Sequence, residues 1–382
     1  MAVTLSSYDV SDLTLGKPSL KSLPITSTVS DAVSSLKRHA DTSIAVLSLS
    51  DLIVAKVCMV DVLCFLLRDD INLSDPLSAL HSPLSALLSK PSGDLVRHID
   101  RHASLLEALD LILEEGAQDL VVPIRQSQSN RKKKNNNHHH HHCWLTQEDV
   151  TRFLLNSIGS FSPLPALSVS SLGLVDPAVL TVGYHDPSLA VSALLPLSLA
   201  NQTAIAVVTS DRKLIGEISP STLANLRDPS VAAAIATLSA GELMAYIDCG
   251  GPPDDIVRAV KNRLSERGLN GLLDLLEESM SATTSSSSCS SGSSSSSDDD
   301  GEGGRRGGRR TLRRRRSSGS YSARMARGSE AIVCHPWSSL VAVMMQALAH
   351  RVGYVWVVED DFSLAGIVTF RDILRVFMEH LE

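Results

Sequence analysis

Residues 364–377, Leu-Ala-Gly-Ile-Val-Thr-Phe-Arg-Asp-Ile-Leu-Arg-Val-Phe, have the composition of a strand that runs directly into a helix. Gly366 leaves the backbone unrestricted, and the β-branched residues after it favour a strand. Thr369 and Asp372 are the polar pair at the junction with the apolar helical run. A hydroxyl at the end of a strand and a carboxylate three residues later can cap the new helix or bind vicinal hydroxyls of a ligand. The pattern permits both interpretations.

The same pattern occurs three more times in the chain. The copy at residues 143–150 is nearly complete, because it keeps both polar members as Thr146 and Asp149. The other two are partial: residues 55–63 keep Asp61 but have Cys58 in place of the hydroxyl, and residues 216–223 keep Ser219 but have Thr222 in place of the carboxylate.

Each copy follows an apolar helical run and a β-branched strand at a constant spacing. This internal repetition predicts four units of strand, helix, strand, strand and helix. The helix start and the strand start lie 15 residues apart in every case: Val29 to Ile44, Leu105 to Leu120, Leu189 to Ala204, and Leu340 to Val355.

The repeated ending, a hydrophobic strand followed by Thr/Ser-x-x-Asp, resembles the CBS domain, the regulatory repeat of the cystathionine-β-synthase type. The layout, including residues 8–13 and 237–247, is similar to the plant four-repeat CBS-domain proteins that are related to the kinase gamma subunit. This resemblance implies an α+β fold in which four β-α-β-β-α repeats pair as two Bateman modules, repeat 1 with repeat 2 and repeat 3 with repeat 4. At 382 residues, the chain is long enough for two such domains, each with its own core.

Two tracts of low complexity interrupt the repeats and predict disordered insertions. One contains five consecutive His, and the other is rich in Ser and Arg. We therefore expect CBS repeat 1 at residues 1–70, a helical connector at 71–94, repeat 2 at 95–160 with a disordered insertion at 126–142, repeat 3 at 172–226, an added helical segment at 227–280, a disordered linker at 281–322, and repeat 4 at 323–382.

Each added segment has two interpretations. The His run is an inert loop or a weak, unselective metal binder, because it lacks fixed geometry. The linker is a solvated spacer, which is compatible with phosphorylation at Ser317 and Ser318, or its Arg cluster serves nucleic-acid binding or nuclear import. The helical segment packs over the second module or forms a docking groove for a partner.

The composition predicts a globular protein of the cytoplasm, with the nucleus as the alternative. Hydrophobic residues make up 43% of the chain, so a core is easily built, and an isoelectric point near 6.0 gives no general nucleic-acid signature. The first residues lack the long apolar run of a secretory signal, and we expect no membrane span. None of the six Cys forms a CxxC pair, so neither a zinc site nor a disulfide framework is indicated.

The repeat does not contain the groups that catalysis requires. It offers no nucleophile with a base, no metal-ligand cluster and no phosphate-binding loop, so we expect a non-enzymatic protein. The CBS resemblance instead implies a binding site, in which the Asp accepts hydrogen bonds from ribose hydroxyls and the Thr or Ser holds the adjacent phosphate or ribose. Carried over to this sequence, the ligand-binding residues are Thr146 with Asp149 and Thr369 with Asp372, and the half-sites are Asp61 and Ser219.

Three functions remain open from the sequence. The first is a regulatory sensor that binds an adenosine-containing ligand (AMP, ADP, ATP or S-adenosylmethionine) and modulates a partner protein. The second is a ligand-free scaffold for protein–protein interaction, which the half-sites favour. The third is nucleic-acid binding, which only residues 305–316 support.

Overall fold

The computed structural model describes residues 8–38, 42–88, 96–124, 141–249, 253–285 and 328–380. Within this range the chain forms four separate three-stranded sheets. In each sheet the first strand is parallel to the second, and the second is antiparallel to the third. The four predicted β-α-β-β-α repeats are thus confirmed.

The first two repeats have the following bounds. Repeat 1 consists of β1 (Ser22–Pro24), α2 (Val29–Arg38), β2 (Ser43–Leu47), β3 (Ile53–Cys58) and α3 (Met59–Leu66). Repeat 2 consists of β4 (Val96–His98), α7 (Leu105–Leu113), β5 (Asp119–Ile124), β6 (His141–Thr146) and α8 (Gln147–Asn156).

The last two repeats follow the same order. Repeat 3 consists of β7 (Thr181–Gly183), α9 (Leu189–Ala200), β8 (Ile205–Val208), β9 (Leu214–Ile218) and α10 (Pro220–Leu226). Repeat 4 consists of β10 (Val333–Cys334), α15 (Leu340–His350), β11 (Tyr354–Val358), β12 (Leu364–Thr369) and α16 (Phe370–Glu379).

Further helices connect the repeats. Helix α1 (Val10–Thr14) precedes repeat 1, and α4 (Asp70–Ser74), α5 (Pro76–His81) and α6 (Leu84–Leu87) follow it. Two 3₁₀ turns, η3 (Ile158–Phe161) and η4 (Leu164–Ala166), follow repeat 2. In the described residues, repeat 3 is followed by α11 (Val231–Thr237), α12 (Ala240–Asp248), α13 (Asp254–Glu266) and α14 (Asn270–Ser285).

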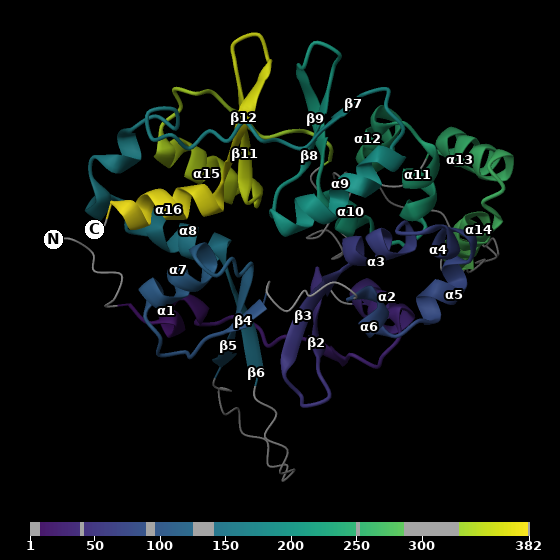
Figure 1. Cartoon of the computed structure of the whole chain (residues 1–382), viewed down its shortest axis with the longest axis horizontal. Helices are drawn as coiled ribbons and strands as arrows, with labels where there is room; N and C mark the ends of the chain where they lie inside the picture. The colour runs from purple at the N-terminus through teal and green to yellow at the C-terminus, as the bar shows by residue number, and fades with distance from the viewer. Residues whose placement is uncertain are drawn as a thin grey trace, which may run out of the picture.

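The sheets pair within modules as expected, repeat 1 with repeat 2 and repeat 3 with repeat 4 (Figure 1). In the first module, Lys56 Nζ donates to both carboxylate oxygens of Asp119, at 2.8 and 2.9 Å. In the second, the carboxylate of Glu217 is fully buried and accepts hydrogen bonds from Tyr354 Oη and Trp356 Nε1, both at 2.6 Å. A buried charge such as that of Glu217 is tolerated only when it is hydrogen-bonded in this way, so each interface contains specific polar links.

The two large apolar cores lie between the modules, which differs from the expected one core per module. One core joins repeats 1 and 3 with the added helices, and the other joins repeats 2 and 4. Helix α3 packs on α9 and α10 in the first core, while α8 packs on α15 and α16 in the second. Figure 1 shows these helices in the middle of the molecule, with the sheets of the two modules above and below them. A single module therefore cannot bury its own helical face.

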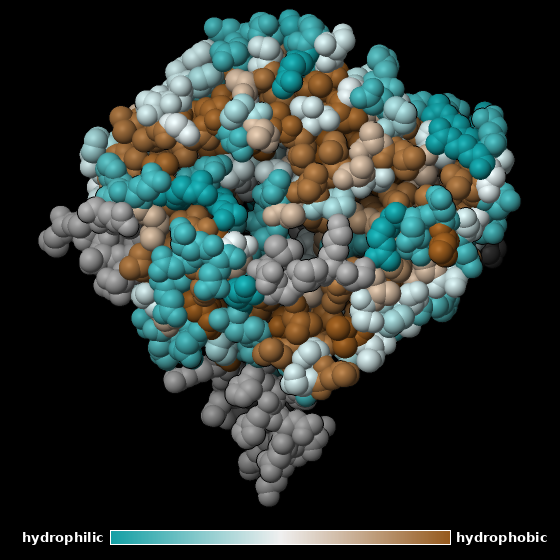
Figure 2. Space-filling view, viewed as in Figure 1, coloured by the Kyte–Doolittle hydropathy of each residue, from teal (hydrophilic) through white to brown (hydrophobic). Residues whose placement is uncertain are grey.

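The added helices pack into the core of repeats 1 and 3. Val260 and Leu264 of α13, together with Leu272 and Leu276 of α14, belong to this core. Helix α14 also contacts α4 and α5, so it reaches the first module. The outward face of α13 is hydrophilic (Figure 2). Of the two interpretations of the added segment, this arrangement therefore favours a packing role for α13 and not a docking groove.

Two predicted boundaries change. Strand β6 begins at His141, so the last two residues of the insertion predicted at 126–142 belong to a strand that pairs with β5. Helix α14 continues to Ser285, past the predicted start of the linker at residue 281. The rest of both insertions, including Ser317 and Ser318, lies outside the described residues.

The shared cores predict that damage in one module destabilises the other. Leu63 of α3 is fully buried, and its truncation to Ala should cost about 2–5 kcal/mol. In a background with Trp144→Phe and Trp337→Phe, the remaining Trp356 reports on the second module. We expect Leu63→Ala to move the Trp356 fluorescence transition to lower urea, whereas Leu49→Ala, at a position 89% exposed, should not. An unchanged Trp356 transition in Leu63→Ala would show that the modules unfold independently.

An ion pair between α12 and α13 predicts a pH-dependent part of the stability. Arg263 donates two hydrogen bonds to the Glu242 carboxylate, at 2.6 and 2.9 Å, and they lower the pKa of Glu242 to about 2. The stabilisation by this ion pair is therefore complete when the pH is above the ordinary pKa of a Glu side chain, and it is lost as the pH falls toward 2. Glu242→Gln preserves the capping of α12 and should lower the free energy of unfolding at neutral pH by about 1 kcal/mol, given its partial exposure.

The measurement is urea unfolding of both proteins across this pH range. The difference between wild type and Glu242→Gln should shrink as the pH is lowered. A difference that stays constant down to about pH 3 would contradict the assigned ion pair.

Candidate ligand-binding site

The Thr/Ser-x-x-Asp motif forms a capping box at the start of the last helix of a repeat. In repeat 4, the Asp372 carboxylate accepts from Thr369 N–H at 3.1 Å and from Thr369 Oγ1 at 2.5 Å, while Asp372 N–H donates to Thr369 Oγ1 at 3.3 Å. The same box occurs at Thr28 and Asp31, where α2 begins and where no ligand is expected. The motif therefore has a structural role wherever it occurs, and a binding role needs further support.

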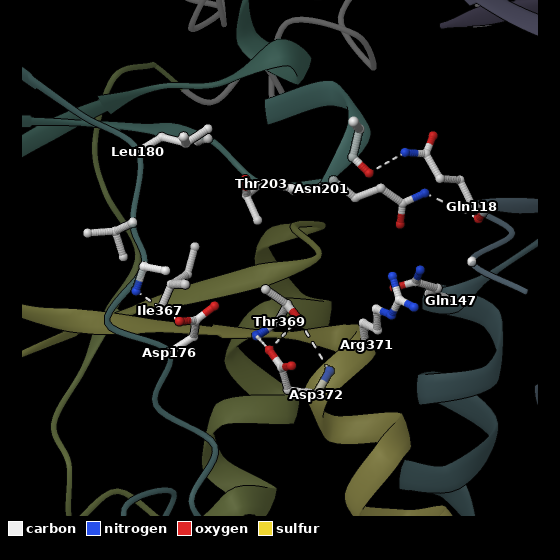
Figure 3. A pocket seen from close by; sticks show the side chains of 16 residues that line it. Gln118, Gln147, Asp176, Leu180, Asn201, Thr203, Ile367, Thr369, Arg371 and Asp372 are labelled. Carbon is white, nitrogen blue, oxygen red and sulfur yellow. Dashed lines mark hydrogen bonds between the residues drawn. The ribbon is translucent and has the colours of Figure 1, made fainter. Parts of the chain in front are cut away.

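Repeat 4 provides that support, because its polar pair lines a cavity of about 210 Å³. Figure 3 shows side chains from three repeats around this space. Repeat 2 contributes Gln118 and Gln147, repeat 3 contributes Asp176 and Thr203, and repeat 4 contributes Thr369, Arg371 and Asp372. The cavity therefore lies where the two modules meet.

Arg371 is the cationic side chain of this cavity. Its Nη2 donates to the carbonyl oxygen of Leu113, the last residue of α7, at 2.8 Å. Its Nε is buried and has no hydrogen-bond partner in the described part of the chain. A buried donor without a partner is costly and often marks a place that a ligand completes.

The strand beside the cavity is fixed by a close backbone approach. Asp176 and Ile367 exchange two backbone hydrogen bonds of 2.9 Å, so the segment before β7 adds to the edge of β12. A Cβ atom at position 366 would lie 2.6 Å from the carbonyl oxygen of Asp176. Gly366 is therefore required for this contact, beyond the backbone freedom expected from the sequence.

The opposite wall of the cavity crosses the module boundary. Gln118 of repeat 2 donates from Nε2 to the carbonyl oxygens of Leu199, at 3.1 Å, and Ala200. Gln202 donates in return from Nε2 to the Gln118 carbonyl oxygen at 3.2 Å. These reciprocal bonds hold the end of α9 against the start of β5. A ligand in the cavity would touch both modules directly.

Repeat 2 has the same motif but a different environment. Thr146 and Asp149 cap α8 with bonds of 2.7–3.3 Å, as in repeat 4. Here, however, the Lys17 ammonium forms an ion pair with the Asp149 carboxylate and donates to the Trp144 carbonyl oxygen at 2.7 Å. The second complete motif is thus occupied by a side chain of the protein.

The half-sites of repeats 1 and 3 are less open to a ligand. Ser219 is only 1% exposed and its hydroxyl lies 3.0 Å from Thr222 Oγ1, so the side chain offers no surface to a ligand. Asp61 accepts from Cys58 N–H at 2.7 Å, and burial raises the pKa of its carboxyl although this bond opposes the shift. Neither half-site is brought to the cavity described above.

Sequence reasoning missed three charged residues of these sites. Arg371 directly precedes Asp372, so its position beside the motif was a usable signal. Asp176 and Lys17 carried no such signal, because each reaches its site from a segment far away in the chain.

The residues that the structure describes contain neither a metal-ligand group nor a candidate membrane span. Among the residues that the structure describes, no three His, Cys, Asp or Glu side chains are grouped so as to hold a metal ion. In the same residues, no helix has the length and apolar character needed to cross a bilayer.

Comparison with known proteins places the chain in a family. The CBS domain model matches residues 330–379, which include all of repeat 4. CBS domain-containing protein CBSX5 from Arabidopsis thaliana is 45% identical over 408 aligned residues, covering 100% of this chain and 99% of that protein. The chain belongs to the CBS domain-containing proteins.

Other matches agree with the assignment to the CBS family. CBS domain-containing protein CBSX6 from Arabidopsis thaliana is 26% identical, covering 98% of this chain and 94% of that protein. Protein MJ1225 from Methanocaldococcus jannaschii, a proposed archaeal homologue of γ-AMPK, has a similar fold, with a TM-score of 0.56 at 13% identity over 97% of this chain and 100% of that chain. The predicted resemblance to plant CBS-domain proteins is confirmed, and the fold is similar to that of a proposed archaeal homologue of the kinase gamma subunit.

Proposed function

We propose that this protein is a non-enzymatic regulatory protein that binds an adenosine-containing ligand beside Asp372 and thereby modulates a partner protein. Its homology to CBS domain-containing proteins fits a regulatory role in nucleotide sensing. The observation that carries the proposal is that Thr369 and Asp372 line a cavity together with Arg371. A cytoplasmic location, with the nucleus as the alternative, stays a prediction.

The carboxylate of Asp372 supplies the acceptor for ribose hydroxyls. Its Oδ2 is used by the capping bonds from Thr369, while Oδ1 lies 3.5 Å from Arg375 Nη1 in a long ion pair. Oδ1 therefore keeps accepting capacity toward the cavity. A hydrogen bond to a charged acceptor contributes roughly 1.5–3 kcal/mol to the free energy of binding, which is enough to distinguish a ligand with a ribose from one without it.

The charges around the cavity favour a ligand with few phosphates. Its described lining contains one cation, Arg371, and two carboxylates, Asp176 and Asp372. A guanidinium matches the geometry of one phosphate group, but a triphosphate would leave several charges beside two carboxylates. Of AMP, ADP, ATP and S-adenosylmethionine, we therefore place AMP first and ATP last.

Ligand binding would act on the contact between the modules. Arg371 uses Nη2 to hold Leu113 of α7, and a phosphate at Arg371 would compete with this carbonyl for the same guanidinium. A ligand shifts a conformational equilibrium only as far as it binds one state better than the other. The competing bond at Arg371 supplies such a difference, and a partner that contacts both modules would respond to it.

The alternative function is a ligand-free CBS scaffold. It is favoured by the occupied motif of repeat 2 and by the buried Ser219. The cavity of about 210 Å³ is also below the roughly 300–1,000 Å³ that is usual for ligand pockets, so a nucleotide would extend out of it or move its walls. Nucleic-acid binding through residues 305–316 rests on a segment outside the described residues.

Calorimetric titration of the full chain with adenosine, AMP, ADP, ATP and S-adenosylmethionine tests the proposal. We expect AMP to bind, and Asp372→Ala to weaken AMP and adenosine by roughly ten- to hundredfold, since one charge-assisted partner is lost. Arg371→Gln should weaken AMP but leave adenosine unchanged, because only AMP carries the phosphate.

Asp31→Ala is the matched control, because it removes the same capping box at a helix away from the cavity. It should lower thermal stability by about 1 kcal/mol, as Asp372→Ala also does, without changing AMP affinity. If none of the five compounds produces heat at millimolar concentration with the wild-type chain, the scaffold function replaces the sensor.

A further inference from the structure

Each module begins with a segment that forms backbone hydrogen bonds to the second repeat of that module, and the two segments do so in the same way. Residues 8–21 lead into repeat 1 and residues 167–180 lead into repeat 3; we call both leading segments. Val10 N–H donates to Ala103 O at 3.0 Å, and Val169 N–H donates to Ser338 O at 2.9 Å. Each leading segment thus lies against the second repeat of its own module, at equivalent positions.

The match continues on both sides of these bonds. Leu105 N–H donates to the Tyr8 carbonyl at 2.8 Å, and Leu340 N–H donates to the Leu167 carbonyl at 2.9 Å. The isolated bridges between Asp9 and Ser104 and between Ser168 and Ser339 occupy the same place. The leading segments are therefore structural counterparts, and their side chains can be compared directly.

They deliver opposite charges to the two complete Thr-x-x-Asp sites. In the second module, the leading segment brings Asp176 to the rim of the cavity that contains Asp372. In the first module, the leading segment turns at Gly16, which has a φ of +79°, and places Lys17 on Asp149. One site is thus bordered by a carboxylate, and the other contains an ammonium group.

Lys17 binds two acceptors of its site, and one of them, Asp149 Oδ2, also accepts the capping bonds from Thr146. Its Nζ bonds the Asp149 carboxylate and the backbone carbonyl of Trp144, from the strand that leads into α8. The Lys17 and Asp149 side chains are 23% and 14% exposed, so this ion pair is partly buried. In repeat 4, no described residue from another segment forms such an ion pair with Asp372, and Arg375, which lies 3.5 Å away, belongs to the same helix.

We propose that Lys17 is an internal occupant of the repeat 2 site, and that it determines which of the two complete motifs takes a ligand. The inference rests on the proposed function for the identity of the ligand. A ribose hydroxyl and an ammonium group are both donors that seek the same carboxylate. The ammonium group of Lys17 forms an ion pair with Asp149, whereas a ribose hydroxyl offers only a neutral donor, so the hydroxyl competes poorly and the repeat 2 site stays closed to nucleosides. The wild-type chain then has one open site out of two.

Removal of the charge tests this inference. Lys17→Met keeps the aliphatic stem of the side chain but removes the donors, and Lys17→Arg keeps a cation. Calorimetric titration with AMP should give one site for wild type and for Lys17→Arg, and two sites for Lys17→Met. In Lys17→Met combined with Asp149→Ala, the number of sites should return to one.

A separate variant distinguishes this inference from the proposed function. Asp372→Ala weakens the repeat 4 site, so any AMP binding that Lys17→Met adds to Asp372→Ala must occur at Asp149. Binding gained in this way supports the occupant role of Lys17 even if the wild-type chain binds no AMP, in which case only the open site at Asp372 is rejected. An unchanged number of sites in folded Lys17→Met, together with no AMP binding gained by Lys17→Met with Asp372→Ala over Asp372→Ala alone, overturns the inference.

Discussion

The structure depends on burial of the helix faces between the two modules. A three-stranded sheet with two helices is too small to remove all of its apolar surface from water, so each repeat needs partners on two sides. The sheets meet within a module, and the helices meet across the modules, where fully buried side chains such as Leu63 and Phe377 lie. Because the cavity forms where the helix layers and the sheet ends meet, it exists only when both modules are assembled.

The Thr-x-x-Asp pair can cap a helix and, through its carboxylate, also bind a further partner. It caps a helix at Thr28 and Asp31, where the side chains are exposed, in the same way as at Thr369 and Asp372. Capping leaves one carboxylate oxygen with accepting capacity, and only the surroundings decide what uses it. In repeat 2, Lys17 binds the same Oδ2 of Asp149 that accepts the capping bonds, whereas in repeat 4 the cavity leaves Asp372 accessible to a ligand.

The sequence was sufficient for the local features. The glycine, β-branched and Thr-x-x-Asp pattern of residues 364–377 predicted each strand-to-helix junction, because these preferences act between neighbours in the chain. It did not predict the ion pair between Lys17 and Asp149, the buried Glu217 with Tyr354 and Trp356, or the cores between modules. These contacts join residues more than one hundred positions apart, or depend on how two modules pack. The hydrophobic periodicity of the sequence does not predict such contacts.

Amide hydrogen exchange with and without AMP tests the central claim, a ligand site built by three repeats of both modules, most directly. The account predicts that AMP slows exchange together in peptides covering residues 116–118 of repeat 2, 176–180 of repeat 3 and 367–372 of repeat 4, since a bound ligand touches all three. Peptides covering Thr28 and Asp31 should not change, because that capping box lies away from the cavity. Protection confined to one repeat, or centred on residues 28–31, would contradict the account.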